Sequence, residues 1–469
     1  MGIGRGITGL LFAAGDYLAI ILAELIALGL RNWLMDGTYY WVSPFYLYVV
    51  TPLLFMGFIY TKGLYLRKML FWQIAEKLFH ACLYGILLSI VLLFAAQVSE
   101  QVSRLYVGLL SCLVFPFLLA MRWIIGKGFI RRLRLRTPLL IVGAGLSADA
   151  VVREIRRDTG MEYDIIGFLE DGAPKTDLLR RYPVLGGFDD LEKVVKETGV
   201  QSILIAAPGL PQDQLAALIY RAQTAAEDVG IIPNLVAVPM SNVTVETFFD
   251  EKIMVLHVKN NLAKASNRLI KRIFDLCLTI PGIILLSPVF LWIAWKIRKD
   301  SEGPVVYKSP RIGKNGKTFT CYKFRSMYMN SDAILQKYLA SHPKEKAEWD
   351  KYLKLKHEDP RVTPVGSFLR RTSLDEIPQL FNVLKGEMSL VGPRPILPKE
   401  MERYGASIRN YNSVSPGITG LWQTSGRSDV DFEGRVRMDD WYIHNWSVWI
   451  DIVMLWRTVA VVLAHKGAY

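Results

Sequence analysis

Long apolar segments are the feature of the sequence that most restricts its fold. Four of them fill the first third of the chain, at about 8–30, 44–61, 79–98 and 105–126. Each approaches the ~20 residues that a helix needs to cross the hydrocarbon core of a bilayer. Because that core offers the backbone no hydrogen-bond partners, such segments have to be helical. The sequence therefore predicts a membrane protein whose residues 1–136 form a four-helix transmembrane bundle.

Basic residues gather on one side of this predicted bundle. They precede the first segment, separate the second from the third and follow the fourth: Arg5, Lys62, Arg67, Lys68, Lys77, Lys127, Arg131, Arg132, Arg134 and Arg136. The two other loops carry only Arg31 and Arg104. By the positive-inside rule, both ends of the bundle face the cytoplasm. Asp16, inside the first segment, is an intramembrane acid and so a candidate functional residue, although it lies near the segment's end.

The overall charge supports a membrane or phosphate partner. The net charge is +13, and 51% of the residues are hydrophobic. No zinc-finger spacing or arginine-rich tract points to nucleic acid, so we expect no nucleic-acid partner. The cysteines are scattered along the chain (Cys82, Cys112, Cys277 and Cys321). This scatter predicts reduced core or lipid-facing residues, with no disulfide framework or metal site.

Residues 137–245 show the pattern of a Rossmann-like α/β domain. Predicted strands at 139–142, 164–169 and 202–206 alternate with helical patterns. The first strand leads into Gly143-Ala-Gly145-Leu-Ser-Ala148, a G-x-G-x-x-A turn of the dinucleotide-binding type, and Glu170 or Asp171 lies where such folds place a ribose-binding acid. No Tyr-x-x-x-Lys pair follows. We therefore favour a structural or regulatory domain over a cofactor site, and we expect residues 246–264 to be a linker.

A fifth apolar segment lies within residues 271–299. Pro281-Gly282 and Ser287-Pro288 interrupt it, and prolines remove backbone donors. Both flanks are basic (Lys271 and Arg272 before; Lys296, Arg298 and Lys299 after). These flanks favour a re-entrant helix–break–helix that enters and leaves on the cytoplasmic face, over a kinked fifth spanning helix. Asp275, near the entrance, could pair with Arg272 or a neighbouring base.

The stretch Thr372–Pro395 carries the predicted chemistry. It places two adjacent carboxylates, Asp375 and Glu376, at the start of a short predicted helix that Gly386 ends. The apolar stripe of this helix is Leu374, Ile377, Leu380, Phe381 and Leu384. Arg370 precedes the acids and Arg394 follows them, a combination suited to chemistry on a phosphate. The alternative is structural, because Ser373-x-x-Glu376 also forms a capping box.

Further candidate residues flank this stretch. Lys323 and Arg325 are two apart on a predicted strand, so both point to one face and could clamp a phosphate. A glycine-rich segment after residue 416 contains Arg427. In the tail, residues 438–464, four tryptophans lie on apolar helical runs (Trp441, Trp446, Trp449 and Trp456). They favour interfacial helices lying on the membrane; the alternative is a core helix.

Several of these stretches together resemble a known family. KRIFDLCLTIPGIILLSPVF, YKFRSM, RRTSLDEIPQLFNVLKGEMSLVGPRP, PGITGLWQTSGR and DDWYIHNWSVW are similar to the motifs of the bacterial sugar transferases, the monotopic phosphoglycosyl transferases. The resemblance covers residues 265–469. With a four-helix start and a Rossmann-like middle, the chain resembles the long polyprenyl-phosphate hexose-1-phosphate transferases. The resemblance thus implies an α/β monotopic catalytic domain in the bacterial inner membrane.

The resemblance also implies a mechanism. Asp375 would attack the β-phosphate of a UDP-hexose, form an aspartyl-phosphosugar and release UMP; undecaprenyl phosphate would then accept the sugar phosphate. Glu376 would hold Mg²⁺. The basic residues Lys323, Arg325, Arg370 and Arg394 would bind phosphates, with Arg427 at the nucleotide end. Ser287 and Pro288 match the family's membrane break.

Several features remain open at this stage. Galactose is the expected sugar and glucose the alternative, and the product would enter O-antigen, capsule or exopolysaccharide assembly. A homodimer is plausible. Two rival classes are a scaffold without catalysis, in which the acid pair only caps a helix, and a nucleotide-sugar dehydratase or epimerase built on the middle domain. The second rival would need a bound nicotinamide cofactor.

Overall fold

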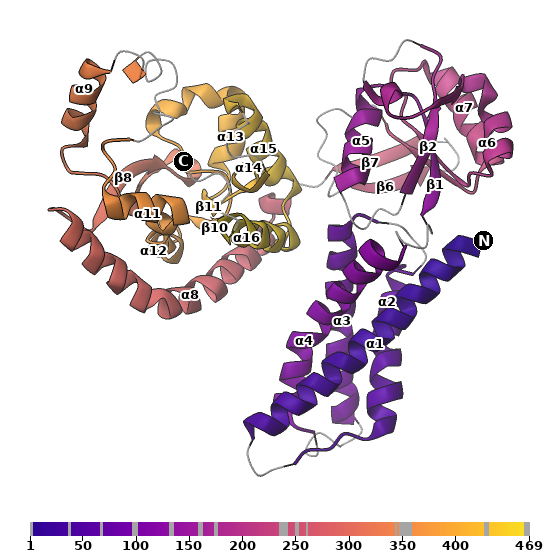
Figure 1. Cartoon of the computed structure of the whole chain (residues 1–469), viewed down its shortest axis with the longest axis horizontal. Helices are drawn as coiled ribbons and strands as arrows, with labels where there is room; N and C mark the ends of the chain where they lie inside the picture. The colour runs from indigo at the N-terminus through magenta and orange to yellow at the C-terminus, as the bar shows by residue number, and fades with distance from the viewer. Residues whose placement is uncertain are drawn as a thin grey trace. The chain divides into compact units, whose positions relative to one another are not determined.

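The chain forms two compact units, Met1–Val236 and Ala237–Tyr469. Both are shown in Figure 1, which draws the computed structural model of the protein. The structure describes residues 3–35, 39–65, 69–95, 102–130, 136–157, 163–172, 177–233, 243–248, 253–258, 261–342, 345–346, 359–425 and 431–463. The first unit holds a helical bundle and a parallel sheet, and the second holds the acid pair Asp375–Glu376.

Helices occupy all four predicted apolar segments of the first unit. They are α1 (Ile3–Leu34), α2 (Thr51–Thr61, after the π-helical turn η1, Tyr46–Val50), α3 (Phe71–Ala95) and α4 (Arg104–Ile124, continued by η2, Ile125–Ile130). Three stretches here are long and apolar enough to cross a membrane: Ile7–Leu34, Phe71–Ala95 and Arg104–Gly128. The apolar stretch Tyr46–Thr61 is shorter. The four predicted apolar helices are thus confirmed, and three of them are long and apolar enough to cross a membrane.

Asp16 has a structural partner inside this bundle. Its side chain is fully buried, and Arg122 of α4 meets it with two nitrogens, Nη2 at 2.5 Å from Oδ2 and Nε at 3.1 Å from Oδ1. The remaining Arg122 amino group donates to the carbonyl of Leu64 at 3.2 Å. A bidentate pair of this kind fixes geometry because both groups are planar. Asp16 therefore joins α1 to α4.

The middle of the chain forms the predicted Rossmann-like sheet. Five parallel strands are ordered β3-β2-β1-β4-β5 (Val184–Gly186, Tyr163–Leu169, Thr137–Val142, Ser202–Ile205 and Asp228–Ile231). Helix α5 (Leu146–Arg157) packs on one face, while α6 (Leu191–Thr198) and α7 (Gln212–Ala225) pack on the other. Strand order reverses beside β1, as in doubly wound folds.

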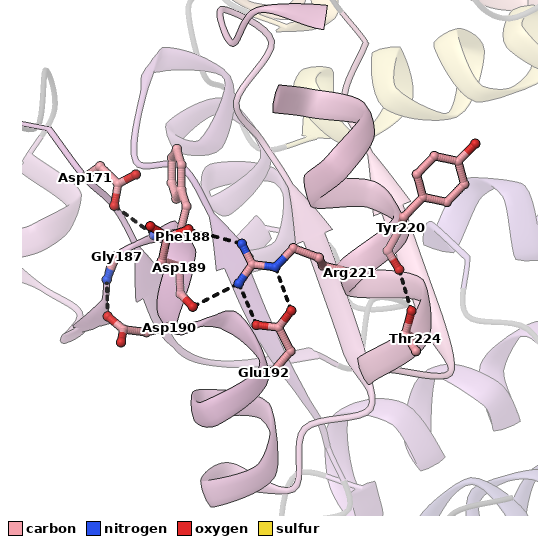
Figure 2. Close-up of polar contacts among 9 residues, drawn as sticks. All are labelled: Asp171, Gly187, Phe188, Asp189, Asp190, Glu192, Tyr220, Arg221 and Thr224. Carbon is pink, nitrogen blue, oxygen red and sulfur yellow. Dashed lines mark hydrogen bonds and ion pairs between the residues drawn. The ribbon is translucent and has the colours of Figure 1, made fainter. Parts of the chain in front are cut away.

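Arg221 joins the two helices that share a face of this sheet. From α7 it donates to both carboxylate oxygens of Glu192 at 2.6 Å and to the carbonyl of Asp189 at 2.9 Å (Figure 2). Glu192 and Asp189 lie at the start of α6 and in the turn before it. The charged fork thus fixes the packing of α6 against α7 at their exposed edge.

The second unit combines short strands with helices. Its strand pairs are β6–β7 (Val243–Phe248 and Ile253–Val258), β8–β9 (Val306–Ile312 and Thr318–Phe324) and β10–β11 (Ser389–Val391 and Gly417–Thr419). The helices are α8 (Ala265–Asp300), α9 (Ser331–Ser341), α11 (Pro364–Thr372), α12 (Gln379–Lys385), α13 (Ile408–Asn412), α14 (Leu421–Ser425), α15 (Phe432–Asn445) and α16 (Val448–Leu463). The expected linker therefore contains most of an antiparallel hairpin, β6–β7.

Helix α8 is continuous where an interruption was expected. Its 36 residues stay helical across Pro281 and Pro288, and Figure 1 shows one curved ribbon along a side of the unit. Proline 288 cannot donate to the carbonyl of Ile284, and the Ser287 hydroxyl donates to that carbonyl instead, at 2.7 Å. The hydroxyl thus compensates for the lost backbone bond. The helix–break–helix prediction is corrected to an unbroken, curved helix.

A buried ion pair holds the first part of α8. Lys271 lies 2.7 Å from Asp451 of α16, whose carboxylate also accepts from Tyr442 at 2.7 Å and Trp446 at 3.0 Å. Asp275, one turn later, accepts from the backbone amide of Leu390 at 3.1 Å. The three groups that donate to Asp451 satisfy a charge that would otherwise be costly to bury.

Arg272 also binds the folded unit, but its partner is not Asp275. It donates to the carbonyls of Val383 and Leu384, at 2.5 and 2.8 Å, at the end of α12. Of the two suggested partners of Asp275, Arg272 is therefore wrong, and the neighbouring base that acts on Asp275 is Lys271. A cation suits this position, because the last carbonyls of a helix have no partner within the helix.

The last part of α8 packs on the same unit. Ile293 and Ile297 are buried against Phe324 of β9 and Leu369 of α11. Arg325, directly after β9, donates to the carbonyl of Ser301 at 2.7 Å and to that of Glu302. Both ends of the 36-residue helix are thus held by one folded unit.

The tryptophans of the tail have two different environments. Trp446 is 2% exposed and donates to Asp451, so it belongs to the core, and its predicted interfacial position is wrong. Trp441 and Trp456 are 44% and 65% exposed. For these two the interfacial position stays a prediction. All four cysteines are free, as expected.

Replacing Asp451 by Asn should destabilise the second unit strongly. The change keeps the side-chain shape but leaves Lys271 buried without its counter-charge, which costs about 3–5 kcal/mol. We expect the unfolding temperature of the full chain in detergent to fall by on the order of 10 °C. Trp456→Ala, on the exposed face of α16, is the control and should change little. Equal melting of Asp451→Asn and wild type would contradict this role.

Candidate active site

The acid pair lies in a tight turn between two helices. Helix α11 is capped by Thr363, whose hydroxyl accepts from the amide of Gly366 at 2.9 Å. It ends at Ser373, which has the left-handed φ of 57°. The following 3₁₀ turn, Leu374–Glu376, carries Asp375 and Glu376. Ser373 makes no side-chain cap hydrogen bond, so the capping-box alternative is wrong.

Helix α12 starts three residues after the acid pair and ends at Gly386 as predicted, with φ 86°. Its buried face differs from the predicted stripe, because Phe381 and Leu384 are 40% and 41% exposed while Asn382 is fully buried. The Asn382 amide accepts from the backbone of Tyr322 at 3.0 Å and donates to Thr320 at 2.7 Å. The sequence analysis missed this polar link, which fixes α12 to strand β9.

Two basic side chains lie next to the acid pair. Lys323 of β9 places Nζ 2.6 Å from Oε1 of Glu376. Arg370 of α11 is oriented by Ser326, whose hydroxyl accepts from its Nε at 2.9 Å. The strand and the two helices therefore bring together four of the predicted site residues, Lys323, Arg370, Asp375 and Glu376.

Arg394 reaches the same cavity from a backbone crossing of two glycines. Gly392 and Gly417 approach so closely that a Cβ on Gly417 would lie 2.1 Å from the Gly392 nitrogen. This contact permits the parallel pairing of β10 and β11, and Arg394 follows β10. Its guanidinium lies 5.4 Å from the ring centre of Trp422, a cation–π distance.

Burial changes the acid–base properties of these groups. Burial, and then the negative charge of Glu376, raise the pKa of Asp375 to about 6, while Lys323 and Arg370 act in the opposite direction. Burial also lowers the pKa of Arg370 and of Arg394 below the ordinary arginine value. Arginine remains protonated at neutral pH even so. Asp375 is therefore a carboxyl group that changes charge close to physiological pH.

A cavity of about 1410 Å³ contains these side chains. Its acidic lining residues are Asp375, Glu376 and Asp431, and its cationic ones are Lys308, Arg311, Lys323, Arg325, Arg370, Arg394, Arg403 and Arg435. The excess of positive charge suits a ligand with several negative charges, because a low-dielectric cleft strengthens such attraction. The arrangement can bind a polyanion and offer it a carboxylate nucleophile.

Three arginines of this lining were missed by the sequence analysis. Arg403 lies 3.9 Å from the ring centre of Phe432, and Arg435 lies 4.7 Å from Phe432 and 5.2 Å from Trp422. Arg311 donates to the carbonyl of Pro395 at 3.2 Å. No motif spacing links these positions, so only the folded chain shows that they share a cavity.

Arg325, a predicted phosphate-binding residue, is placed differently from the others. Arg325 is only 4% exposed, and its two amino groups donate to the carbonyls at the end of α8, so its guanidinium is used inside the fold. Its position on the cavity wall agrees with the prediction that it shares a face with Lys323. Arg427 lies outside the described residues.

The glycine-rich turn of the middle domain donates a backbone hydrogen bond to Glu170, one of the two predicted ribose-binding acids. Gly143 has φ 96°, and a Cβ there would lie 2.8 Å from the carbonyl oxygen of Ala206. Glu170 accepts from the amide of Ala144 at 2.6 Å, the kind of donor that binds phosphate in dinucleotide sites. Asp171 accepts from the amide of Phe188 at 2.8 Å. Both predicted ribose-binding acids thus bind backbone amides.

No cluster of three or more metal-binding side chains occurs among the residues that the structure describes. The acid pair still fits Mg²⁺, because this ion commonly uses one or two protein carboxylates together with substrate phosphates and water. Asp375 and Glu376 line a cavity large enough to admit such a substrate.

Comparisons with known proteins identify the family. Residues 266–465 match bacterial sugar transferase, and residues 62–233 match a CoA-binding domain. The undecaprenyl-phosphate galactose phosphotransferase of Salmonella typhimurium is 37% identical, and the UDP-galactose-lipid carrier transferase of Erwinia amylovora 38%; each alignment covers 85% of this chain and 83% of the relative. The UDP-glucose:undecaprenyl-phosphate glucose-1-phosphate transferase of Escherichia coli is 31% identical, covering 74% and 72%. The chain belongs to the bacterial sugar transferase family and is a membrane-bound transferase.

Asp375 should lose its proton at a higher pH than an ordinary aspartate does. A carbodiimide reacts with protonated carboxyl groups, so labelling of Asp375 should be half-maximal near pH 6 and decrease above it. Glu376→Gln removes a like charge and should move this midpoint to lower pH. Mass spectrometry of the Asp375 peptide measures both effects. A midpoint near pH 4 in the wild type would contradict the burial described here.

Arg325 and Arg394 should respond differently to replacement by Gln. Arg325→Gln leaves carbonyls at the end of α8 without a donor and should lower stability by about 1–3 kcal/mol, measured by thermal unfolding. Arg394→Gln should instead weaken binding of inorganic pyrophosphate by about tenfold, because a cation facing the cavity is lost. The opposite pattern would assign the phosphate contact to Arg325.

Proposed function

We propose that the chain transfers a hexose-1-phosphate from a UDP-hexose to undecaprenyl phosphate and releases UMP, initiating O-antigen, capsule or exopolysaccharide assembly. The observation that carries the proposal is a half-buried carboxyl group, Asp375, beside Glu376 in a cavity that eight cationic side chains line among the described residues. A scaffold without catalysis would not need such a cavity. Galactose is the preferred sugar, because the relatives named for galactose are 37–38% identical and the one named for glucose is 31% identical; glucose is the alternative.

The proposed reaction has two displacements at one phosphorus atom. An oxygen of the ionised Asp375 attacks the β-phosphorus, and the bond between that phosphorus and the bridging oxygen breaks, so the electron pair leaves with UMP. An oxygen of undecaprenyl phosphate then attacks the same phosphorus and displaces the Asp375 carboxylate, which is regenerated. Covalent catalysis of this kind divides one difficult transfer into two easier ones.

Fixed cations would support both displacements. Arg370, held by Ser326, and Lys323, held by Glu376, lie beside the nucleophile, and Arg394 approaches from β10. They would bind the diphosphate and offset negative charge on the departing UMP oxygen. Glu376 would hold Mg²⁺. When bound, the ion neutralises phosphate charge and makes UMP a better leaving group.

We further propose that α8 enters and leaves the membrane on the cytoplasmic face. A straight helix of 36 residues would be about 54 Å long, more than the ~30 Å hydrocarbon core. Both ends of α8 contact the same unit, and residues between them are highly exposed, with Ile284, Leu285 and Leu291 at 66–77%. A helix crossing to the far side would separate these ends. Re-entry leaves both flanks cytoplasmic and the acid pair within reach of a lipid headgroup.

A turnover assay tests the function. We expect UMP release from UDP-galactose or UDP-glucose only with undecaprenyl phosphate in multiple turnover. Asp375→Asn should reduce it by more than about a thousandfold, because the nucleophile is lost. Glu402→Gln, an exposed acid of the same unit, is the matched control. The better of the two donors identifies the sugar.

A trapping experiment tests the covalent step separately. Without the lipid acceptor, UDP-hexose labelled in its β-phosphate should leave label on the peptide that contains Asp375, and added undecaprenyl phosphate should remove it. The Asp375→Asn chain should acquire none. If turnover needs the lipid but the Asp375 peptide of the wild type carries no label, the covalent mechanism is wrong and the transferase function stands.

A further inference from the structure

The bundle of the first unit contains a cavity that the proposed transfer reaction does not use. Its volume is about 480 Å³, within the range of small-ligand sites, and its walls come from α2, α3, α4 and residues 40–50. Most of the lining is apolar or aromatic. Seven lining residues carry hydroxyl groups: Tyr40, Ser43, Tyr46, Thr51, Ser89, Tyr106 and Ser111.

A buried acid lies directly behind this wall. Glu24 of α1 is fully buried, and Tyr106 donates to its Oε1 at 3.2 Å. Its second oxygen, Oε2, has no hydrogen-bond partner, and neither does the hydroxyl of Thr51, which lies beside both Glu24 and Tyr46. Among the described residues, no lysine or arginine pairs with Glu24. Buried polar groups of this kind normally have partners, so these atoms point to a missing one.

The direction of the hydrogen bonds defines what could bind. Tyr106 uses its proton on Glu24, so its oxygen can only accept further bonds. The Thr51 hydroxyl, which is buried on the cavity wall and has no partner, can also accept a hydrogen bond through its lone pairs. No described lining residue is cationic, so nothing there balances a phosphate or carboxylate. The site suits a molecule that donates a hydrogen bond, carries no negative charge and is otherwise apolar.

We propose that this cavity binds an amphiphile whose head donates a hydrogen bond to Thr51 and Tyr106 and whose chain lies along the apolar wall. A long-chain alcohol and a long-chain amine share this chemistry. The hydroxyl groups distinguish the site from a groove for acyl chains alone, since an acyl chain has no use for buried acceptors. The proposal does not depend on the transfer reaction.

Photo-crosslinking of the full chain in lipid nanodiscs tests this site. The probes are a long-chain alcohol, the amine and the carboxylate of equal length, each with the same diazirine. Mass spectrometry measures labelling of the α2, α3 and α4 peptides. We expect the alcohol or the amine to label them and the carboxylate to label them weakly. If the amine labels more strongly than the alcohol, and Glu24→Gln removes this preference, the ligand has an ammonium head. If the amine shows no such preference, the ligand class is the alcohol.

Variants of the wall separate specific binding from bulk lipid. Thr51→Val removes one hydroxyl at constant shape and should lower labelling about five- to tenfold. Ser89→Leu should abolish labelling by filling the cavity. Gly57→Leu, on α2 where a Cβ meets nothing within 4 Å, is the matched control and should change nothing. Thermal unfolding confirms that each variant is folded. Equal labelling by all three probes, or no effect of Thr51→Val and Ser89→Leu, means bulk lipid only and overturns the proposal.

Discussion

The attachment of both ends of α8 to one folded unit is the constraint on which the C-terminal unit depends. At one end, Lys271 and Asp451 bury opposite charges 2.7 Å apart, with Tyr442 and Trp446 donating to the carboxylate. At the other end, Arg325 binds the carbonyls of Ser301 and Glu302, directly after the helix. A buried pair costs desolvation energy and contributes mainly when every charge has partners, as here. The main effect of such a pair is to hold the helix in one position, and its net contribution to stability is small.

The same bonds position the candidate active site. Arg272 of α8 binds the end of α12, whose preceding turn carries the acid pair. Asp275 binds the amide of Leu390 in β10, and Arg394 follows that strand. Arg325 continues strand β9, which holds Lys323. Each of these elements of the site is therefore one contact from α8, a helix long and apolar enough to cross a membrane. On the proposed placement of α8 in the membrane, these contacts set the position of the site relative to the lipid.

Local patterns in the sequence predicted most elements, and long-range partners were not predictable. Hydropathy located the four helices, and the G-x-G-x-x-A turn located the sheet, because both signals repeat within a short window. Asp451 and Lys271 are 180 residues apart, and nothing in either segment shows that they meet. Trp446 has the same periodicity as its exposed neighbours, so its burial depended on the partner Asp451. The sequence pattern predicted that Ser373 caps a helix, because the residue type does not show that its φ is positive.

The electrostatics of the acid pair suit Asp375 to the proposed role of nucleophile. An isolated buried carboxylate would take up a proton, and the adjacent Glu376 favours this further. Lys323 forms its ion pair with Glu376, at 2.6 Å, so its attraction reaches Asp375 only through space. A direct ion pair on Asp375 would hold its pKa low but would also occupy the oxygens that the proposed attack requires. Because Lys323 pairs with Glu376, the pKa of Asp375 stays close to physiological pH. The positive charge of Lys323 is still nearby, and the carboxylate of Asp375 remains available to a phosphate.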